Sequence, residues 1–234
     1  MRVAGLVALL LIAPFTAAPA SAGDIADRAI LGFSADGTKF AFEEFGTQDG
    51  SGFPYSSVFV IDTNADAWIP GSPVRVRIDR EGATVTDARK EAAEKAAGLL
   101  SGIAPRGRLV ASNPVTELAA DPHLVRFVPR AAVPPIDTPL ELAIEEYPLA
   151  VADAPEGEEV KGFRLTLRTN AGERLLHEDS EIPANRGFPT EYRIADVIVY
   201  YPPGGRPVLV TLVMMLVYGF EGPDGRYLAI ATHL

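Results

Sequence analysis

Short runs of apolar, β-branched and aromatic residues, separated by glycine, proline, asparagine and aspartate, follow one another along most of the chain after about position 23. Such runs are typical of β-strands joined by turns. The pattern predicts strands at 29–33, 39–44, 56–62, 124–128, 139–146, 162–169, 173–178, 191–201, 208–220 and 226–232. Asp36-Gly37 lies between the first two, and this dipeptide is a strong signal for a tight hairpin turn.

One of these runs, Val208 to Phe220, is continuously apolar instead of alternating. A strand with that pattern is expected to be covered on both faces. Its 13 residues are fewer than the roughly 20 that a membrane-spanning helix needs. The sequence therefore predicts a central strand here and no transmembrane segment in the chain after residue 22.

A helical pattern is found at 86–101, where Ala88, Ala92 and Ala96 recur on one face and charged residues occupy the others. Thr86 is expected to cap its first turn. A face of alanines can approach a sheet closely. The predicted fold class is thus α+β and β-rich, with mostly antiparallel sheets and one packed amphipathic helix near 86–101, in a single secreted domain at 23–234.

The first 22 residues have the features of a secretory signal peptide. Arg2 precedes an apolar run from Val3 to Phe15, and small residues end in Ala20-Ser21-Ala22. We therefore expect cleavage after Ala22 and a periplasmic or secreted protein.

The amino-acid composition excludes several kinds of catalytic, metal and nucleic-acid-binding site. The chain has no cysteine, which excludes a thiol nucleophile, a disulfide and any thiolate metal site. Its formal charge is −10, and removal of Arg2 with the signal peptide would make it −11. An acidic surface repels phosphate backbones, so nucleic-acid binding is not expected.

A ligand site is predicted at the loop Gln48–Tyr55, where glycines let the backbone approach a ligand and carboxylates, a hydroxyl and aromatic rings come close in sequence. The candidate ligand-binding residues are Glu43, Glu44, Asp49, Ser51, Phe53 and Tyr55. The structural alternative is a wide turn in which Phe53 and Tyr55 simply pack on the sheet.

Patterns for metals and catalysis are incomplete. Asp62 to Asp66 begins like a calcium loop, but Ala67 replaces the required glycine and Pro73 stands in place of the bidentate glutamate. His177 and Glu178 are neighbours on a predicted strand and point to opposite faces. No G-x-S-x-G element is present. We predict no metal and no cofactor, and we assign no catalytic residue.

Two resemblances concern longer segments. The stretch 32–42 followed by 58–68 resembles a single blade of the periplasmic β-propeller proteins, but a propeller repeats its blade at least four times and the chain has one copy. A second resemblance covers the segments Gly23-Asp24, Gly32–Ser34, Asp36-Gly37, Phe40–Gly46, Asp49–Tyr55, Asp62, Pro73–Val76, YRIADVIVYYPPGG and YGFEGPDGRYLAIA. These are similar to a bacterial family of predicted secreted proteins, domain of unknown function 2259. That resemblance implies export and supplies no site residues.

The function predicted from the sequence is an exported, non-enzymatic protein of the bacterial cell envelope that binds a small molecule or another envelope protein. One alternative is a carboxylate-based hydrolase acting near residues 43–55, with Glu43, Glu44 and Asp49. Another is a purely structural envelope component.

Overall fold

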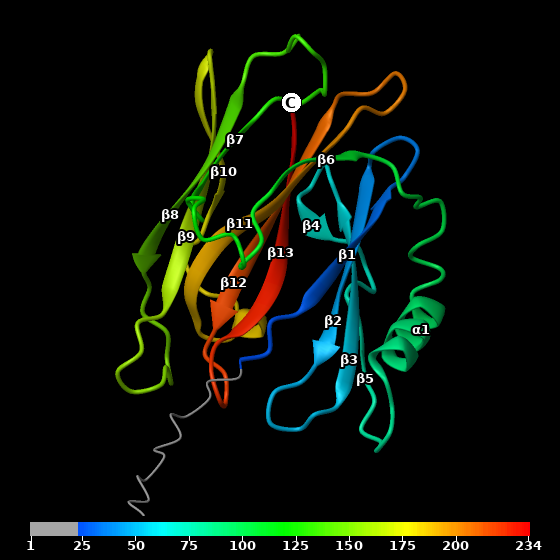
Figure 1. The fold of residues 1–234 in the computed structure, drawn as a ribbon, viewed down its shortest axis with the longest axis vertical. Helices are drawn as coiled ribbons and strands as arrows, with labels where there is room; N and C mark the ends of the chain where they lie inside the picture. The colour runs from blue at the N-terminus through cyan, green and yellow to red at the C-terminus, as the bar shows by residue number, and fades with distance from the viewer. Residues whose placement is uncertain (1–22) are drawn as a thin grey trace, which may run out of the picture.

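The computed structural model describes residues 23–234, and the predicted signal peptide lies outside the described residues. Three antiparallel sheets and one α-helix make up the fold (Figure 1), which confirms the predicted β-rich α+β class. Sheet I contains β1 (Asp27–Phe33), β2 (Lys39–Thr47), β3 (Pro54–Asp62), β4 (Ala67–Trp68) and β5 (Val74–Arg77).

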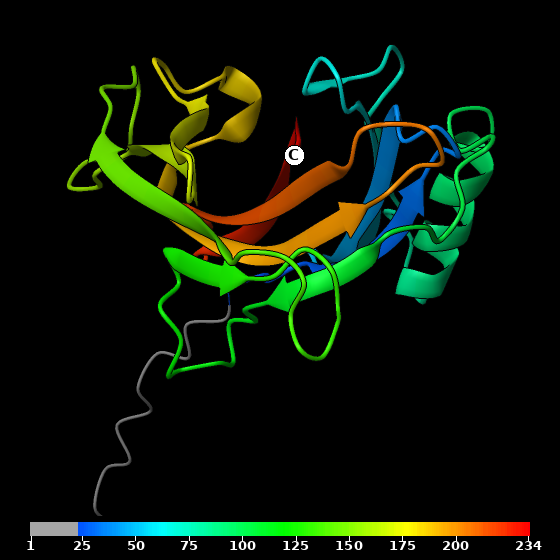
Figure 2. The same cartoon turned by 90° about the horizontal axis from the view of Figure 1, so that it is seen from above.

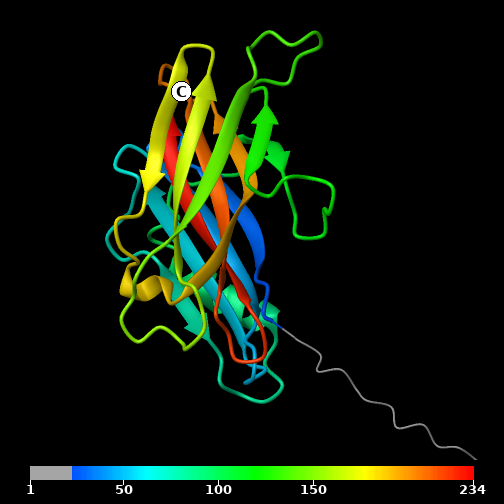
Figure 3. The same cartoon turned by 90° about the vertical axis from the view of Figure 1, so that its left-hand side faces the viewer.

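The other two sheets have four strands each. Sheet II, which faces the viewer in Figure 3, has the order β10-β9-β8-β7 and contains β7 (Leu124–Phe127), β8 (Leu140–Pro148), β9 (Lys161–Thr169) and β10 (Gly172–Glu178). Sheet III has the order β13-β12-β11-β6 and contains β6 (Arg108–Ser112), β11 (Pro189–Tyr200), β12 (Val208–Val217) and β13 (Asp224–His233). A short 3₁₀ helix, η1 (Ala184–Arg186), joins β10 to β11.

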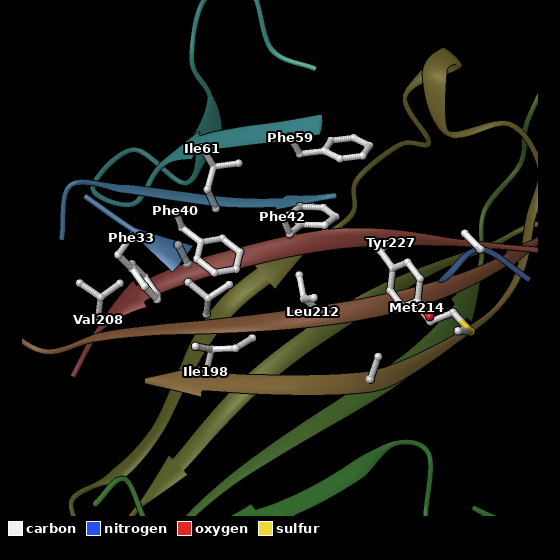
Figure 4. Close-up of a cluster of buried hydrophobic side chains, with 14 of the residues drawn as sticks. Phe33, Phe40, Phe42, Phe59, Ile61, Ile198, Val208, Leu212, Met214 and Tyr227 are labelled. Carbon is white, nitrogen blue, oxygen red and sulfur yellow. The ribbon is translucent and has the colours of Figure 1, made fainter. Parts of the chain in front are cut away.

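Sheet III lies between the other two sheets (Figure 1), and each interface is a separate apolar core. Sheet I contributes a row of aromatic side chains, including Phe33, Phe40 and Phe42, that packs on one face of sheet III (Figure 4). The opposite face of sheet III packs on sheet II through residues such as Leu165 and Val213. Because both of its faces are covered, β12 is buried over its first eight residues, as the continuous apolar run predicts.

The helix α1 (Val85–Lys95) covers the outer face of sheet I. Ala88, Ala92 and Ala96 are fully buried there against Val58 and Val60, so the predicted alanine face is confirmed.

The predicted cap and the predicted C-terminal end of α1 are wrong. The hydroxyl of Thr84, not Thr86, accepts a hydrogen bond from the backbone N–H of Asp87, whose carboxylate accepts from the Thr84 backbone N–H. This reciprocal capping box places the N-cap two residues before Thr86, and the helix begins at Val85. The helix ends at Lys95, and turns continue to Gly102. Gly98 is a poor helix residue, which disfavours extension to Ser101.

Each predicted strand corresponds to an observed one, with ends that differ by a few residues. The turn at Asp36-Gly37 closes the β1–β2 hairpin, and Gly37 has the positive φ of 77° that such a turn requires. The stretch from Gly32 to Gly46 is therefore a hairpin of sheet I. The short strands β4, β5 and β6 were not predicted, since their few residues do not establish an alternating pattern.

Candidate functional site

The adjacent glutamates of β2 point to opposite faces of sheet I. Glu43 lies under α1, where its carboxylate accepts hydrogen bonds from Arg89 at 2.8 Å and from the Ser56 hydroxyl at 2.8 Å. Glu44 points toward sheet III and accepts a hydrogen bond from the backbone N–H of Tyr227 at 3.1 Å. The structure therefore separates the two carboxylates, as period-two alternation requires.

The other candidate residues of the loop 48–55 also diverge. The Asp49 carboxylate accepts from the backbone N–H of Glu221 at 2.9 Å, and the Ser51 hydroxyl donates to Gln48 at 3.1 Å. Phe53 is half-buried. Tyr55 is buried and donates to the Asp24 carboxylate at 3.2 Å, and burial raises the pKa of its hydroxyl. Of the six candidates, Glu44 and Tyr55 line a common hollow, and a ligand site at this loop stays a prediction.

Another cleft lies where the edges of sheets I and II rise on either side of β13. In Figure 2, β13 lies between the gold segment that contains η1 and the teal segment around β4 and β5. The cleft has a volume of about 460 Å³. We call it the rim cleft; the residues that matter for its chemistry are Glu44, Phe59, Asp66, Trp68, Arg75, His177, Pro183, Arg186, Arg226, Tyr227 and Ala229.

Its floor is the outer edge of β13, an edge strand of sheet III. Alternate residues of β13 direct their backbone groups away from β12. Gly225 uses these groups to bond with residues 24 and 26, Tyr227 donates to Glu44, and Ala231 donates to the Asp66 carboxylate at 2.6 Å. Ala229 has the same orientation, and within residues 23–234 its backbone N–H and C=O have no partner on this side.

The two carboxylates that bind β13 differ from ordinary surface acids. Burial raises the pKa of Glu44 to about 7, although the Tyr227 N–H, Arg226 and Arg75 oppose that rise. Burial also raises the pKa of Asp66, against the hydrogen bond from Ala231 and the charge of His177. Asp66 adopts a positive φ of 48°, which directs its side chain to the edge of β13.

One wall of the rim cleft combines aromatic rings with a cation. The Arg75 guanidinium lies over the rings of Trp68 and Phe59, at 5.7 and 5.8 Å from their centroids. Trp68 is 41 % exposed. Among the described residues Arg75 has no ion-pair partner within 4 Å, whereas Arg226 is paired with Asp24 at 2.7 Å. Arg75 is therefore the cation available to a ligand on this wall.

On the opposite wall, the buried carboxylate of Asp179 fixes the positions of two side chains. Asp179 accepts from His177 Nε2 at 2.9 Å and from Arg186 Nη1 at 2.6 Å. Burial opposes its ionisation, but these two hydrogen bonds lower the pKa of Asp179 overall. The His177 ring also stacks on Phe163 at 4.6 Å. The resulting network fixes the position of His177 at the cleft.

Comparison with protein families gives one match. A family model described as "Predicted secreted protein (DUF2259)", the domain of unknown function 2259, matches residues 41–233. The chain belongs to this family. No curated protein and no solved structure matches it. The resemblance found in the sequence is confirmed, and the family description supports a secreted protein.

Two further observations concern metals and membranes. Residues 23–234 of this DUF2259 protein contain no group of three or more histidine, aspartate or glutamate side chains arranged to hold a metal ion. In the same range, no helix combines the length and the apolar character needed to cross a membrane.

Another hollow of the DUF2259 protein, of about 580 Å³, lies between the loop 129–138 and Leu234. Its charged side chains already have partners: Arg130 pairs with Asp137, Glu173 pairs with Arg168, and Arg174 donates to the backbone carbonyl of His233 at 2.8 Å. It therefore offers a ligand fewer available polar groups than the rim cleft does.

Sequence reasoning selected Glu44 but missed most of the rim cleft. In the sequence, Asp66 belongs to an incomplete calcium-loop pattern and His177 to a predicted strand, and no pattern singles out Arg75. These interpretations follow from local pattern alone, because residues from β3–β5, β10, η1 and β13 meet only when the three sheets pack. The exposed tryptophan beside an arginine-rich strand is the one local signal that could have indicated this wall.

Proposed function

We propose that this DUF2259 protein is an exported binding protein that takes a small ligand in the rim cleft. The observation that carries the proposal is the unpartnered backbone of Ala229 beside Arg75, a cation without an ion-pair partner among the described residues. Small-molecule sites are clefts of roughly 300–1,000 Å³ with apolar walls and a few polar groups in fixed positions. The rim cleft, at about 460 Å³, meets that description.

The arrangement of charge supports binding over hydrolysis. A glycosidase-like mechanism needs two carboxylates about 5–10 Å apart across one bond. Glu44 and Asp66 bind backbone N–H groups four residues apart on β13, which corresponds to about 14 Å along the strand. Glu43 is engaged with Arg89 on the other face of sheet I, and Asp49 accepts from a distant loop. A hydrolase built on Glu43, Glu44 and Asp49 therefore has less support.

Two observations support placing this activity outside the cytoplasm. The family description is that of a predicted secreted protein, and residues 1–22 have the composition of a signal peptide. A binding protein of the periplasm or the medium agrees with both. A purely structural envelope role would not explain why the unpartnered backbone groups of Ala229 and the guanidinium of Arg75 lie in the same cleft.

The fluorescence of Trp68 offers a direct test, because it is the one tryptophan in the sequence and it lines the cleft. The purified exported protein would be titrated with amino acids, short peptides, sugars, peptidoglycan fragments, Ca²⁺ and Zn²⁺. Thermal unfolding would be followed in parallel, since a ligand of the native state raises the midpoint. We expect at least one class to change both signals.

Arg75→Gln should weaken that response, whereas Arg108→Gln should not. Arg108 is an exposed arginine of β6, on the opposite edge of sheet III from β13. If no class in the panel produces a response, or if Arg75→Gln and Arg108→Gln respond alike, the proposal is wrong. Release of product from a bound ligand would instead support the hydrolase alternative.

A further inference from the structure

The rim cleft has a floor that a peptide can recognise, and we propose that its ligand is a short extended peptide with free termini, bound as an added strand on β13. This inference rests on the proposed function and names the chemical class of its ligand. Addition of a strand to an exposed sheet edge is an established mode of peptide recognition in which main-chain hydrogen bonds provide affinity.

The pairing would centre on Ala229. Its N–H and C=O both face the cleft and have no partner among residues 23–234. In an antiparallel pair, one ligand residue can exchange both hydrogen bonds with such a residue. Ala229 is half-buried, so these bonds would form in surroundings partly shielded from water, where they are stronger than on an open surface.

Glu44 and Asp66 limit the length of this ligand. They occupy the N–H groups of Tyr227 and Ala231, on either side of Ala229, and thereby block continued pairing in both directions. The distance along β13 between those two N–H groups is about 14 Å, and we call this stretch the interval. A fully extended tripeptide is about 10 Å long. The geometry therefore favours about three residues over a long strand.

Charge sets the direction of the peptide. The Tyr227 end of the interval holds the Glu44 carboxylate together with two guanidinium groups, those of Arg75 and Arg226, whose charges act on Glu44. The Ala231 end carries the Asp66 carboxylate. An α-carboxylate would thus lie toward Arg75 and an α-amino group toward Asp66. Because β13 runs from Tyr227 to Ala231, this orientation makes the peptide antiparallel to β13.

The walls of the rim cleft determine which type of side chain the central residue of the peptide should carry. Directly opposed residues of an antiparallel pair project to the same side. Ala229 packs toward sheet I, so the central ligand side chain would face the wall that contains Phe59 and Trp68. An apolar central residue is expected there, and its neighbours would face His177 and Pro183 on the other wall.

The test is calorimetric titration of the exported protein with Ala-Leu-Ala, followed by three altered peptides. N-methylation of the leucine removes the N–H that would pair with Ala229, N-acetylation removes the amino charge, and C-terminal amidation removes the carboxylate. We expect each change to weaken binding about tenfold or more, because a desolvated polar group loses its partner. Arg75→Gln should weaken the parent peptide and make affinity insensitive to amidation.

An NMR measurement identifies the edge independently of affinity. Exchange of the Ala229 amide hydrogen should slow when Ala-Leu-Ala is added, whereas exchange of the amide hydrogen of Ala93, an exposed residue of α1 far from the cleft, should be unchanged. Affinity that is insensitive to N-methylation, or unchanged exchange at Ala229, overturns the strand-addition inference. If a non-peptide of the earlier panel binds with dependence on Arg75 and no tripeptide does, the peptide inference fails while the proposed function survives.

Discussion

Glu44 of β2 and Tyr227 of β13 are 183 positions apart, yet the Glu44 carboxylate accepts the backbone N–H of Tyr227 at 3.1 Å across the contact between two sheets. The bond places a carboxylate where a neighbouring strand would otherwise place a carbonyl oxygen. It protects part of an exposed sheet edge, which would otherwise be open to pairing with other chains. The same bond buries an ionisable group in the rim cleft.

Stability should consequently depend on the protonation of Glu44. Burial raises its pKa from 4.5 to about 7, so the folded state binds this proton more tightly than the unfolded chain does. The stabilisation is fully present below pH 4.5 and is lost as pH rises toward 7, a change on the order of 3 kcal/mol. Urea unfolding of Glu44→Gln between pH 4.5 and 7.5 should show a weaker decline than that of the unaltered protein.

Glu81→Gln provides the control, since Glu81 is an exposed glutamate outside the cleft. Its unfolding curve should keep the decline of the unaltered protein. An identical pH dependence in Glu44→Gln and in the unaltered protein would contradict the assignment. Burial also raises the pKa of Asp24 and Asp66, so part of the decline should remain in Glu44→Gln.

At the other end of the interval, Asp66→Ala should destabilise the protein by about 2 kcal/mol, because the buried Ala231 N–H loses its acceptor and alanine is disfavoured at the positive φ of 48°. Asp66→Asn should cost clearly less. Asparagine tolerates that φ and retains a carbonyl oxygen as an acceptor. Chemical denaturation of both variants measures the difference.

A variant at Asp153 separates the cost of the positive φ from the loss of the hydrogen bond to Ala231. It also has a positive φ, of 60°, but it lies in an exposed loop. Asp153→Ala should therefore report the backbone cost alone and destabilise the protein less than Asp66→Ala. Equal losses for the two alanine variants would show that the bond to Ala231 contributes nothing.

For α1, Thr84→Ala should cost about 1 kcal/mol, because it removes the hydroxyl that accepts the Asp87 N–H. Thr86→Ala should be neutral or slightly stabilising, since alanine is the better helix former inside the first turn. Thermal unfolding distinguishes the two. A larger loss for Thr86→Ala would restore the boundary predicted from the sequence.

That boundary illustrates what local pattern can and cannot resolve. Both Thr84 and Thr86 are acceptable caps by residue type, and the deciding feature is Asp87 at the third helical position from Thr84. The strand pattern was more decisive, because β11 and β12 are long and their burial leaves a strong apolar signal. The β-rich class and the central position of β12 could thus be predicted.

The rim cleft could not be predicted in the same way. Its polar groups are unremarkable where they stand: Asp66 lies in a turn, Arg75 on a short strand, and Ala229 in an ordinary apolar run. Their chemistry depends on the edge of β13 being left open between two sheets. In the sequence Glu44 lies close to Asp49, whereas its hydrogen-bond partner in the structure, Tyr227, is on the last strand.

The alanine face of α1 makes a final prediction about packing. Ala92 has no exposed surface and lies in the cluster with Val58 and Val60, so the helix and sheet I approach too closely for a larger side chain. Ala92→Leu should destabilise the protein by about 1–3 kcal/mol through overpacking. Ala93→Leu places the same side chain on the exposed face and should change stability by less than about 0.5 kcal/mol. Urea denaturation at a fixed pH compares the two variants, and equal midpoints would mean that the helix can move away from sheet I at little cost.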